Sequence, residues 1–284
     1  MLTDILRLIR FDKPVGTLLL LWPTLSAVFV AANGHPPLYI VVIFSLGVFL
    51  TRSAGCAVND MWDADFDKHV ARTKDRPVAS GRLTRKQALL CALLLSIIAF
   101  LLVLIYLKVT TIFLSMVALV IFMTYPLMKR FFPLPQAYLG IAFSIGILMA
   151  FVEITGQVTF IAWLLFVANL CWVFGYDTIY ALCDKDDDLQ IGIKTSAITL
   201  GRHTTLLVGV CYNIYILLLF WIGVSLHLGF MYYLGMVVIT LLLVQQIKVL
   251  LSGDKKRYFK MFMLNNWVGM LGFITLSLSV SWKS

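Results

Sequence analysis

The sequence predicts an all-α integral membrane protein, a bundle of nine transmembrane helices with a cytoplasmic N-terminus. The composition supports this class, because 61% of the 284 residues are apolar and only 13% are charged, about half the charged share of soluble domains. The mean hydropathy of +0.94 is too high for a water-soluble globule. The same composition excludes a disordered chain and a disulfide scaffold. Two further observations support this fold class: the spacing of the apolar runs and the placement of the basic residues.

Nine apolar runs approach the ~20 residues that a helix needs to cross a bilayer, and open sheets cannot span lipid. Their expected ranges are 15–32, 38–58, 88–107, 110–128, 137–153, 159–180, 205–226, 229–250 and 262–281. The first run is longer than the apolar core of a signal peptide, so we expect an uncleaved helix. Before it, residues 4–13 alternate apolar and basic side chains, which predicts a helix lying flat on the inner membrane face.

The basic residues predict the orientation of the bundle. With the N-terminus inside and nine alternating spans, all of the 23 Lys and Arg residues except Lys108 and Lys283 fall on the inner side. This asymmetry follows the positive-inside rule and predicts a cytoplasmic N-terminus. Topology therefore accounts for the net charge of +9, and we expect no nucleic-acid partner.

The acidic residues are concentrated in two windows that both fall on the predicted cytoplasmic side. Of the 14 acids, Glu153 is the only Glu, and ten Asp lie within residues 60–75 and 177–188. Each window follows an even-numbered span. Because an Asp near the membrane interior costs about 2.5–3.5 kcal/mol, such a concentration needs a chemical reason.

The first window places several side-chain oxygens at helical spacing. Asn59 and Asp63 are four residues apart, and Asp60, Asp63 and Asp67 stand at i, i+3 and i+7. If the second span continues as a helix through this window, these oxygens line one face. Arg52 lies seven residues before Asn59 and shares that face two turns deeper.

The second window repeats the pattern, with Asp177, Tyr180, Asp184 and Asp188 at i, i+3, i+7 and i+11. Carboxylates this close repel one another, and a bound cation removes the repulsion. Oxygen-only ligands favour a hard ion such as Mg²⁺ or Mn²⁺, and Mg²⁺ completes its shell with substrate phosphate. The windows therefore predict Mg²⁺ ions that bridge the protein and a diphosphate. The nearby basic residues that could hold the outer phosphate oxygens are Lys68, Arg72, Lys74, Arg76, Lys129, Arg130, Lys185 and Lys194.

We expect residues 1–284 to form a single membrane-embedded domain. Within it, Asp63-x-x-x-Asp67 is echoed 121 residues later by Asp184-x-x-x-Asp188. This echo predicts two four-helix repeats, about 14–130 and 136–250, followed by a ninth helix.

Both windows resemble the Asp-rich motifs of the UbiA superfamily of intramembrane prenyltransferases. The motif segments are Asn59-Asp60-x-x-Asp63-x-x-x-Asp67 and Tyr176-Asp177-x-x-Tyr180-x-x-x-Asp184-x-x-x-Asp188. Other segments, spread nearly end to end, are similar to the branch of this family that prenylates 4-hydroxybenzoate in bacterial ubiquinone biosynthesis. They are Lys13-Pro14-x-Gly16, Leu21-Trp22-Pro23-Thr24, Arg76-Pro77-x-x-Ser80-Gly81, Tyr125-Pro126-x-Met128-Lys129-Arg130, Asp186-Asp187-Asp188-x-x-Ile191-Gly192-Ile193-Lys194 and Asn265-Asn266.

The resemblance implies a Mg²⁺-dependent enzyme that moves a prenyl group from a polyprenyl diphosphate to the ring carbon ortho to the hydroxyl of 4-hydroxybenzoate. The Mg²⁺-diphosphate ligands would be Asn59, Asp60, Asp63, Asp67, Asp184 and Asp188. Help on the phosphates would come from Arg72, Lys129 and Lys194. Arg52 or Arg130 would pair with the aromatic carboxylate. Asp177 or Tyr180 would orient or deprotonate the phenol, and with Asp184 they form the expected catalytic group.

Three alternatives stay open at this point. A sibling prenyltransferase would act on another quinone precursor, on haem or on homogentisate. A cation-coupled transporter would carry polar residues near the bilayer midplane, whereas these acids gather at one end. A CDP-alcohol phosphotransferase would show its Asp-Gly and Ala-Arg signature within a single segment, which this sequence lacks.

The expected location is the bacterial inner membrane, with a multi-pass chain and an active site that faces the cytoplasm. The sequence begins without a mitochondrial transit peptide, which favours this membrane over the mitochondrial one. The expected partners are the lipid bilayer, polyprenyl diphosphate and 4-hydroxybenzoate, and we expect no required protein partner.

Overall fold

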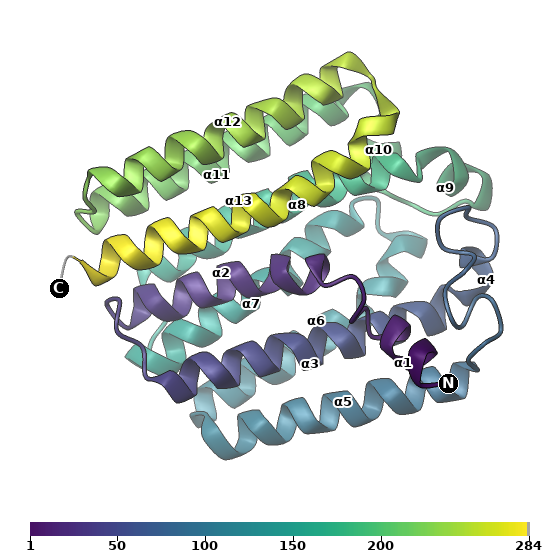
Figure 1. Ribbon diagram of the computed structural model, residues 1–284, viewed down its shortest axis with the longest axis horizontal. Coiled ribbons are helices and arrows are strands. Elements are labelled where there is room, and N and C mark those ends of the chain that lie inside the picture. Colours follow the sequence, from purple (N-terminus) through teal and green to yellow (C-terminus); the bar gives the residue numbers. More distant parts are fainter. Residues whose placement is uncertain (283–284) are drawn as a thin grey trace.

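The computed structural model describes residues 1–282 and confirms the all-helical fold, with no strand among those residues. The long helices lie side by side as a bundle (Figure 1). They are α2 Val15–Ala31, α3 Leu38–Trp62, α5 Arg85–Tyr106, α6 Val109–Phe131, α7 Pro135–Thr155, α8 Phe160–Cys183, α11 Thr204–Ser225, α12 Phe230–Ser252 and α13 Lys255–Ser281. Each contains most of one predicted run. Eight are long and apolar enough to cross a membrane, and α2 is a shorter apolar helix. The chain is therefore a multi-pass membrane protein.

Short helices connect the long ones. They are α1 Leu2–Leu8, α4 Ala64–Asp67, α9 Lys185–Ile191, α10 Ser196–Thr199 and the 3₁₀ turn η1 Gly201–His203. Figure 1 shows α1, α4 and α9 at one end of the bundle, while α13 ends at the other. The two Asp windows therefore lie at the same end.

Both Asp windows contain a helix break, so the prediction of continuous helical stripes was wrong. α3 ends at Trp62, and Asp63 takes a bridge-region conformation (φ −90°, ψ 3°) before α4 begins. α8 ends at Cys183, and Asp184 also takes a bridge-region conformation (φ −107°, ψ 4°) before α9 begins. Each break redirects the carboxylates that follow it.

The N-terminal helix also ends earlier than predicted: α1 ends at Leu8, whereas the predicted helix covered residues 4–13. Phe11 N–H donates to Leu6 O (2.9 Å) and Arg10 N–H donates to Arg7 O (3.1 Å), which is a Schellman closure. This closure requires a left-handed residue, and Arg10 takes that place with φ +58°. Gly usually stands here, because a side chain in this conformation costs roughly 1–2 kcal/mol. Another interaction of Arg10 must offset that cost.

The core is built around α8, which packs against α7, α11 and α13. Trp172, Tyr176 and Ile179 on α8 are almost completely buried. Gly175 lets α11 approach, because a Cβ at this position would lie 2.3 Å from Tyr212 Cε1. By contrast, α5 and α6 present many large apolar side chains on their outer faces. Lipid rather than water covers such faces in a membrane protein, so α7 and α8 are interior helices and α5 and α6 are peripheral.

A buried polar network joins four helices inside the bundle. Asn265 on α13 accepts from Trp172 Nε1 (2.9 Å) and donates to Gln246 Oε1 (3.0 Å). The same Gln246 oxygen accepts from Tyr212 Oη (2.8 Å). Because lipid offers no replacement partners, these bonds hold α8, α11, α12 and α13 in register.

Replacing Asn265 with Ala is expected to lower the free energy of unfolding by about 1–3 kcal/mol, because Trp172 Nε1 and the Gln246 amide lose buried partners. Thermal or denaturant unfolding of the purified protein in detergent measures the change. Asn213→Ala is the matched control, since Asn213 lies on the exposed side of α11 and donates only to Gly209 O. Equal stability of the two variants would contradict the role given to the network.

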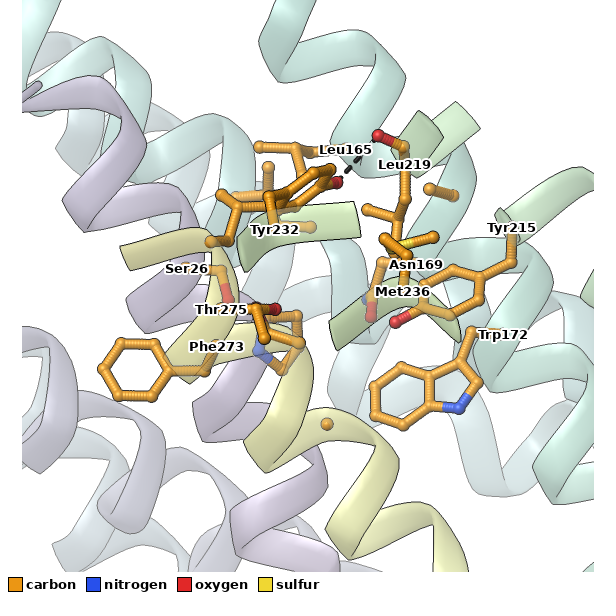
Figure 2. A pocket seen from close by; sticks show the side chains of 16 residues that line it. Ser26, Leu165, Asn169, Trp172, Tyr215, Leu219, Tyr232, Met236, Phe273 and Thr275 are labelled. Carbon is orange, nitrogen blue, oxygen red and sulfur yellow. Dashed lines mark hydrogen bonds between the residues drawn. The ribbon is translucent and has the colours of Figure 1, made fainter. Parts of the chain in front are cut away.

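A small cavity lies between α2, α7, α8, α11, α12 and α13 (Figure 2). Its volume is ≈ 40 Å³, and Asn169 and Tyr215 are among the polar residues that line it. Asn169 Oδ1 has no hydrogen-bond partner in the described part of the chain. A cavity of this size has room for a few water molecules.

The structure leaves the proposed internal duplication untested. The single domain over 1–284 and its four-helix repeats at 14–130 and 136–250 stay predictions.

Candidate active site

Both Asp windows line one pocket at the α4 and α9 end of the bundle. Its volume is ≈ 110 Å³. The first window contributes Asp63 and Asp67, and the second contributes Asp177, Asp184 and Asp188. The basic residues that line the same pocket are Arg72, Arg76 and Lys129. Two clusters that are more than 100 residues apart in the sequence therefore face a single space.

In the first window, each pocket carboxylate is bonded to a basic side chain. Lys129, at the end of α6, donates to Asp63 Oδ2 (2.9 Å) and reaches Asn59 Oδ1 (3.4 Å). Arg76 donates to Asp67 Oδ2 (2.8 Å). Burial raises the pKa of Asp67 above its usual range despite this pairing. The basic residues thus act as counterions for carboxylates that the pocket partly desolvates.

The second window is tied to the connection that follows α4. Arg72 forms a two-point ion pair with Asp184, with Nε 2.9 Å from Oδ1 and Nη2 on Oδ2. The guanidinium also lies 4.0 Å from the centre of the Tyr180 ring. Close by, Ala71 N–H donates to Asp187 Oδ2 (3.3 Å). These contacts join the two windows across the pocket.

Asp177 and Asp188 line the pocket but form no hydrogen bond or ion pair through their side chains with any residue in 1–282. Burial, reinforced by the nearby Asp184 carboxylate, raises the pKa of Asp188 to about 7. With five carboxylates against three basic residues, the pocket lacks positive charge. An oxygen-only donor set with unpaired carboxylates is what a hard divalent cation requires, so the residues fit Mg²⁺.

No three acidic, Cys or His side chains of residues 1–282 already converge as a metal cluster. Asp63, Asp67 and Asp184 instead bond to Lys129, Arg76 and Arg72. A cation that used these carboxylates would have to displace the basic side chains. The released Lys and Arg groups would then be free to bind an anion.

Five residues predicted for the site do not line the pocket. Asp60 has no exposed surface and pairs with Arg10 and Arg76. The Asn59 side chain accepts from Lys129, as described above. Arg130 is exposed and donates to Trp62 O (3.2 Å). Lys194 is exposed as well and donates to Phe131 O (2.9 Å).

Arg52 also lies outside the pocket lining, and this partly buried cation has no carboxylate partner among residues 1–282. Its Nη1 donates to Cys56 Sγ (3.0 Å), while Nε is buried without a partner. Gly16 makes room for it, because a Cβ there would lie 2.9 Å from Arg52 Nη2. The guanidinium carbon lies 5.8 Å from the centre of the Phe143 ring. A guanidinium without a carboxylate partner is suited to a ligand carboxylate.

Some pocket residues had no predicted role. Tyr125 and Gln136 line the pocket, and Gln136 also accepts from Ser196 N–H (2.8 Å), which fixes the chain after α9. Tyr125 stands in one of the quoted family segments, which was an available signal. No sequence signal pointed to Gln136.

Solved structures that share this fold include two UbiA homologs. A UbiA homolog from Aeropyrum pernix K1 superposes with a TM-score of 0.80 at 23% identity, covering 92% of this chain and 98% of that one. A UbiA homolog from Archaeoglobus fulgidus, solved with GPP and Mg²⁺, gives a TM-score of 0.72 at 15% identity, covering 98% and 99%. At these identities the likeness establishes the shared fold.

Sequence relatives are much closer. The 4-hydroxybenzoate octaprenyltransferase of Cupriavidus pinatubonensis is 49% identical over 267 residues, which cover 94% of this chain and 93% of that protein. The protein of the same name from Ralstonia nicotianae is 48% identical over 273 residues, covering 96% and 94%. The family pattern described as "UbiA prenyltransferase family" matches residues 20–270. The chain therefore belongs to the UbiA prenyltransferase family.

Proposed function

We propose that this protein transfers a polyprenyl group from a polyprenyl diphosphate to 4-hydroxybenzoate, at the ring carbon ortho to the hydroxyl. The observation that carries the proposal is the single pocket shared by both Asp windows and by Arg72, Arg76 and Lys129. The names of relatives at 48–49% identity support the aromatic substrate. The GPP and Mg²⁺ in the Archaeoglobus fulgidus homolog support a prenyl diphosphate and this metal.

The carboxylates of the pocket would hold Mg²⁺. The proposed ligands are Asp63, Asp67, Asp184 and Asp188, with Asn59 beside them. When bound, Mg²⁺ would neutralise the negative charge that grows on the diphosphate as the allylic C–O bond breaks. The apolar bundle would receive the isoprenoid tail and exclude water from the reacting carbon.

The basic residues would exchange partners when the substrates bind. Lys129 and Arg72 would leave Asp63 and Asp184 to the cation and bind phosphate oxygens instead, and Lys194 would assist from the rim. Neither the cation nor the diphosphate alone can satisfy all these charges. Each is therefore expected to raise the affinity of the pocket for the other.

The aromatic acid would bind deeper, with its carboxylate on Arg52. This choice over Arg130 is supported by the buried, unpaired Nε of Arg52 and by the exposure of Arg130. The phenol would then point back toward the pocket. Asp177 is the better proton acceptor of the two candidates, because its carboxylate has no bonded partner, whereas Tyr180 packs under Arg72.

The affinity for Mg²⁺ should depend on pH through Asp188. Its raised pKa of about 7 means that a proton competes with the cation at neutral pH. Deprotonation favours the cation, so Mg²⁺ affinity measured with pyrophosphate should rise about tenfold from about pH 6 to about pH 8. Calorimetry in buffers of different ionisation enthalpy would detect the released proton. Asp188→Asn should remove this pH dependence, and its persistence in that variant would contradict the assignment.

The pocket is proposed to face the cytoplasm across a bacterial inner membrane. The positive-inside distribution of Lys and Arg supports this orientation. The lipid bilayer would supply the polyprenyl diphosphate laterally.

The test is a transfer assay with the purified protein in lipid vesicles, Mg²⁺, a polyprenyl diphosphate and ring-labelled 4-hydroxybenzoate. A lipid-extractable, labelled product that requires Mg²⁺ is expected, and EDTA should abolish it. Product with homogentisate but none with 4-hydroxybenzoate would favour the sibling prenyltransferase. If neither 4-hydroxybenzoate nor homogentisate gave a product, the proposed function would be overturned.

A further inference from the structure

We infer that Arg10 and Asp60 are positioning residues that hold Arg76 in the wall of the pocket, so that the N-terminal segment forms part of the diphosphate site. The inference rests on the proposed function, because it concerns how that site is kept in shape. Neither Arg10 nor Asp60 lines the pocket. Both act through Arg76, which does.

A continuous chain of ion pairs leads from the N-terminal segment to the pocket. Arg10 Nη2 lies 2.6 Å from Asp60 Oδ1, and Arg76 Nη1 lies 3.4 Å from the same oxygen. Arg76 Nη1 also lies 2.8 Å from Asp67 Oδ2. Asp60 itself has 0% exposed surface. Asp60 is therefore a buried anion between two guanidinium groups, one of which faces the pocket.

The buried carboxylate gives Arg76 a partner that does not depend on the ligands. When a cation takes the oxygens of Asp67, Arg76 loses its closest contact. Asp60 then keeps the guanidinium against the pocket wall, where it can meet phosphate oxygens. Arg10 in turn gives Asp60 a second counterion, so the buried carboxylate keeps an ion-pair partner when Arg76 contacts phosphate.

The backbone of Arg10 is a second, independent observation. Arg10 adopts a left-handed conformation, with φ +58°, at a helix closure where Gly is the favoured residue. Local backbone energetics therefore oppose an arginine at this position. A strained residue whose side chain reaches a buried carboxylate is expected where the side chain is needed.

The test is Arg10→Gly in the full-length protein, because this change relieves the backbone while it removes the guanidinium. Isothermal calorimetry in detergent with Mg²⁺ and inorganic pyrophosphate should give an affinity about tenfold below that of the unchanged protein. The KM for polyprenyl diphosphate should rise while kcat changes little, and the thermal midpoint without ligand should not fall. Arg10→Lys keeps the charge and should recover part of the affinity.

Asp4→Asn is the matched control. Asp4 Oδ1 lies 3.0 Å from Arg82 Nε, so this pair also ties α1 to the connection after α4, but without a link to the pocket. Asp4→Asn should bind pyrophosphate as tightly as the unchanged protein.

Two outcomes would overturn the inference. One is unchanged pyrophosphate affinity in Arg10→Gly. The other is an equal loss in Asp4→Asn, which would assign the effect to docking of α1 in general. If the unchanged protein failed to bind pyrophosphate with Mg²⁺, the proposed function itself would fail instead, so the two failures are distinguishable.

Discussion

Asp184→Asn is expected to reduce prenyl transfer by about a thousandfold while the protein remains folded and inserted. The change keeps the shape of the side chain but removes the charge that pairs with Arg72 and would bind Mg²⁺. Loss of one metal ligand removes several kcal/mol of charge stabilisation in the transition state, and roughly 4 kcal/mol corresponds to a factor of about a thousand. Product formation in vesicles with saturating Mg²⁺ and both substrates measures the loss.

Asp186→Asn provides a control two residues away. Asp186 is 69% exposed and pairs only with Lys255, outside the pocket. The Asp186→Asn variant should retain close to full activity, because an exposed ion pair contributes little to stability. If Asp184→Asn were as active as Asp186→Asn, the metal role of the second window would be refuted.

Arg52→Gln is expected to lower kcat/KM for 4-hydroxybenzoate by about a hundredfold. Gln retains a hydrogen-bond donor but loses the charge, and a hydrogen bond to a charged group contributes about 1.5–3 kcal/mol. Affinity for pyrophosphate with Mg²⁺ should stay unchanged, because Arg52 does not line the diphosphate pocket. Steady-state kinetics with a varied concentration of the aromatic acid would measure the effect.

A phenol without a carboxylate separates this role from a general packing effect. The unchanged enzyme should prefer 4-hydroxybenzoate strongly over such a phenol, and Arg52→Gln should lose most of that preference. Arg130→Gln is the matched arginine control, since Arg130 is exposed, donates to Trp62 O and lies over the Trp62 and Phe66 rings. If kcat/KM for 4-hydroxybenzoate fell in Arg130→Gln but not in Arg52→Gln, Arg130 rather than Arg52 would be the residue that binds the aromatic carboxylate.

The sequence predicted the helices well because hydropathy decides them. A run of apolar residues long enough to cross lipid has few alternatives to a helix. Most ends of the predicted runs therefore lie within a few residues of the ends of the observed helices. The meeting of the two Asp windows was also predictable. Both follow even-numbered spans, and helices that alternate direction return their even-numbered ends to one side of the membrane.

The sequence failed where a helix breaks among polar residues. The interpretation of Asp60, Asp63 and Asp67 as one stripe assumed an unbroken helix, yet α3 ends at Trp62. Asp60 remains on the last buried turn, while the two later carboxylates turn toward the pocket. Spacing alone does not distinguish these outcomes, because it does not reveal that Asp63 and Asp67 form ion pairs with the distant Lys129 and with Arg76.

The partners of the ion pairs likewise could not be predicted from the sequence. Arg10 was predicted only as one of the basic residues on the inner membrane face, and its buried partner, Asp60, is 50 positions away. Asn265 was quoted only as part of a family segment, although it organises a hydrogen-bond network across four helices. Single polar residues in apolar helices carry no periodic signal that identifies their partners.

The three pocket ion pairs also bear on how a catalytic cycle ends. Lys129, Arg76 and Arg72 each have a carboxylate of their own to return to. In the proposed reaction, release of pyrophosphate would not leave these basic side chains unpaired, because each would re-form its internal ion pair with a pocket carboxylate. Product release would therefore cost less free energy than the number of charged contacts to the substrate suggests.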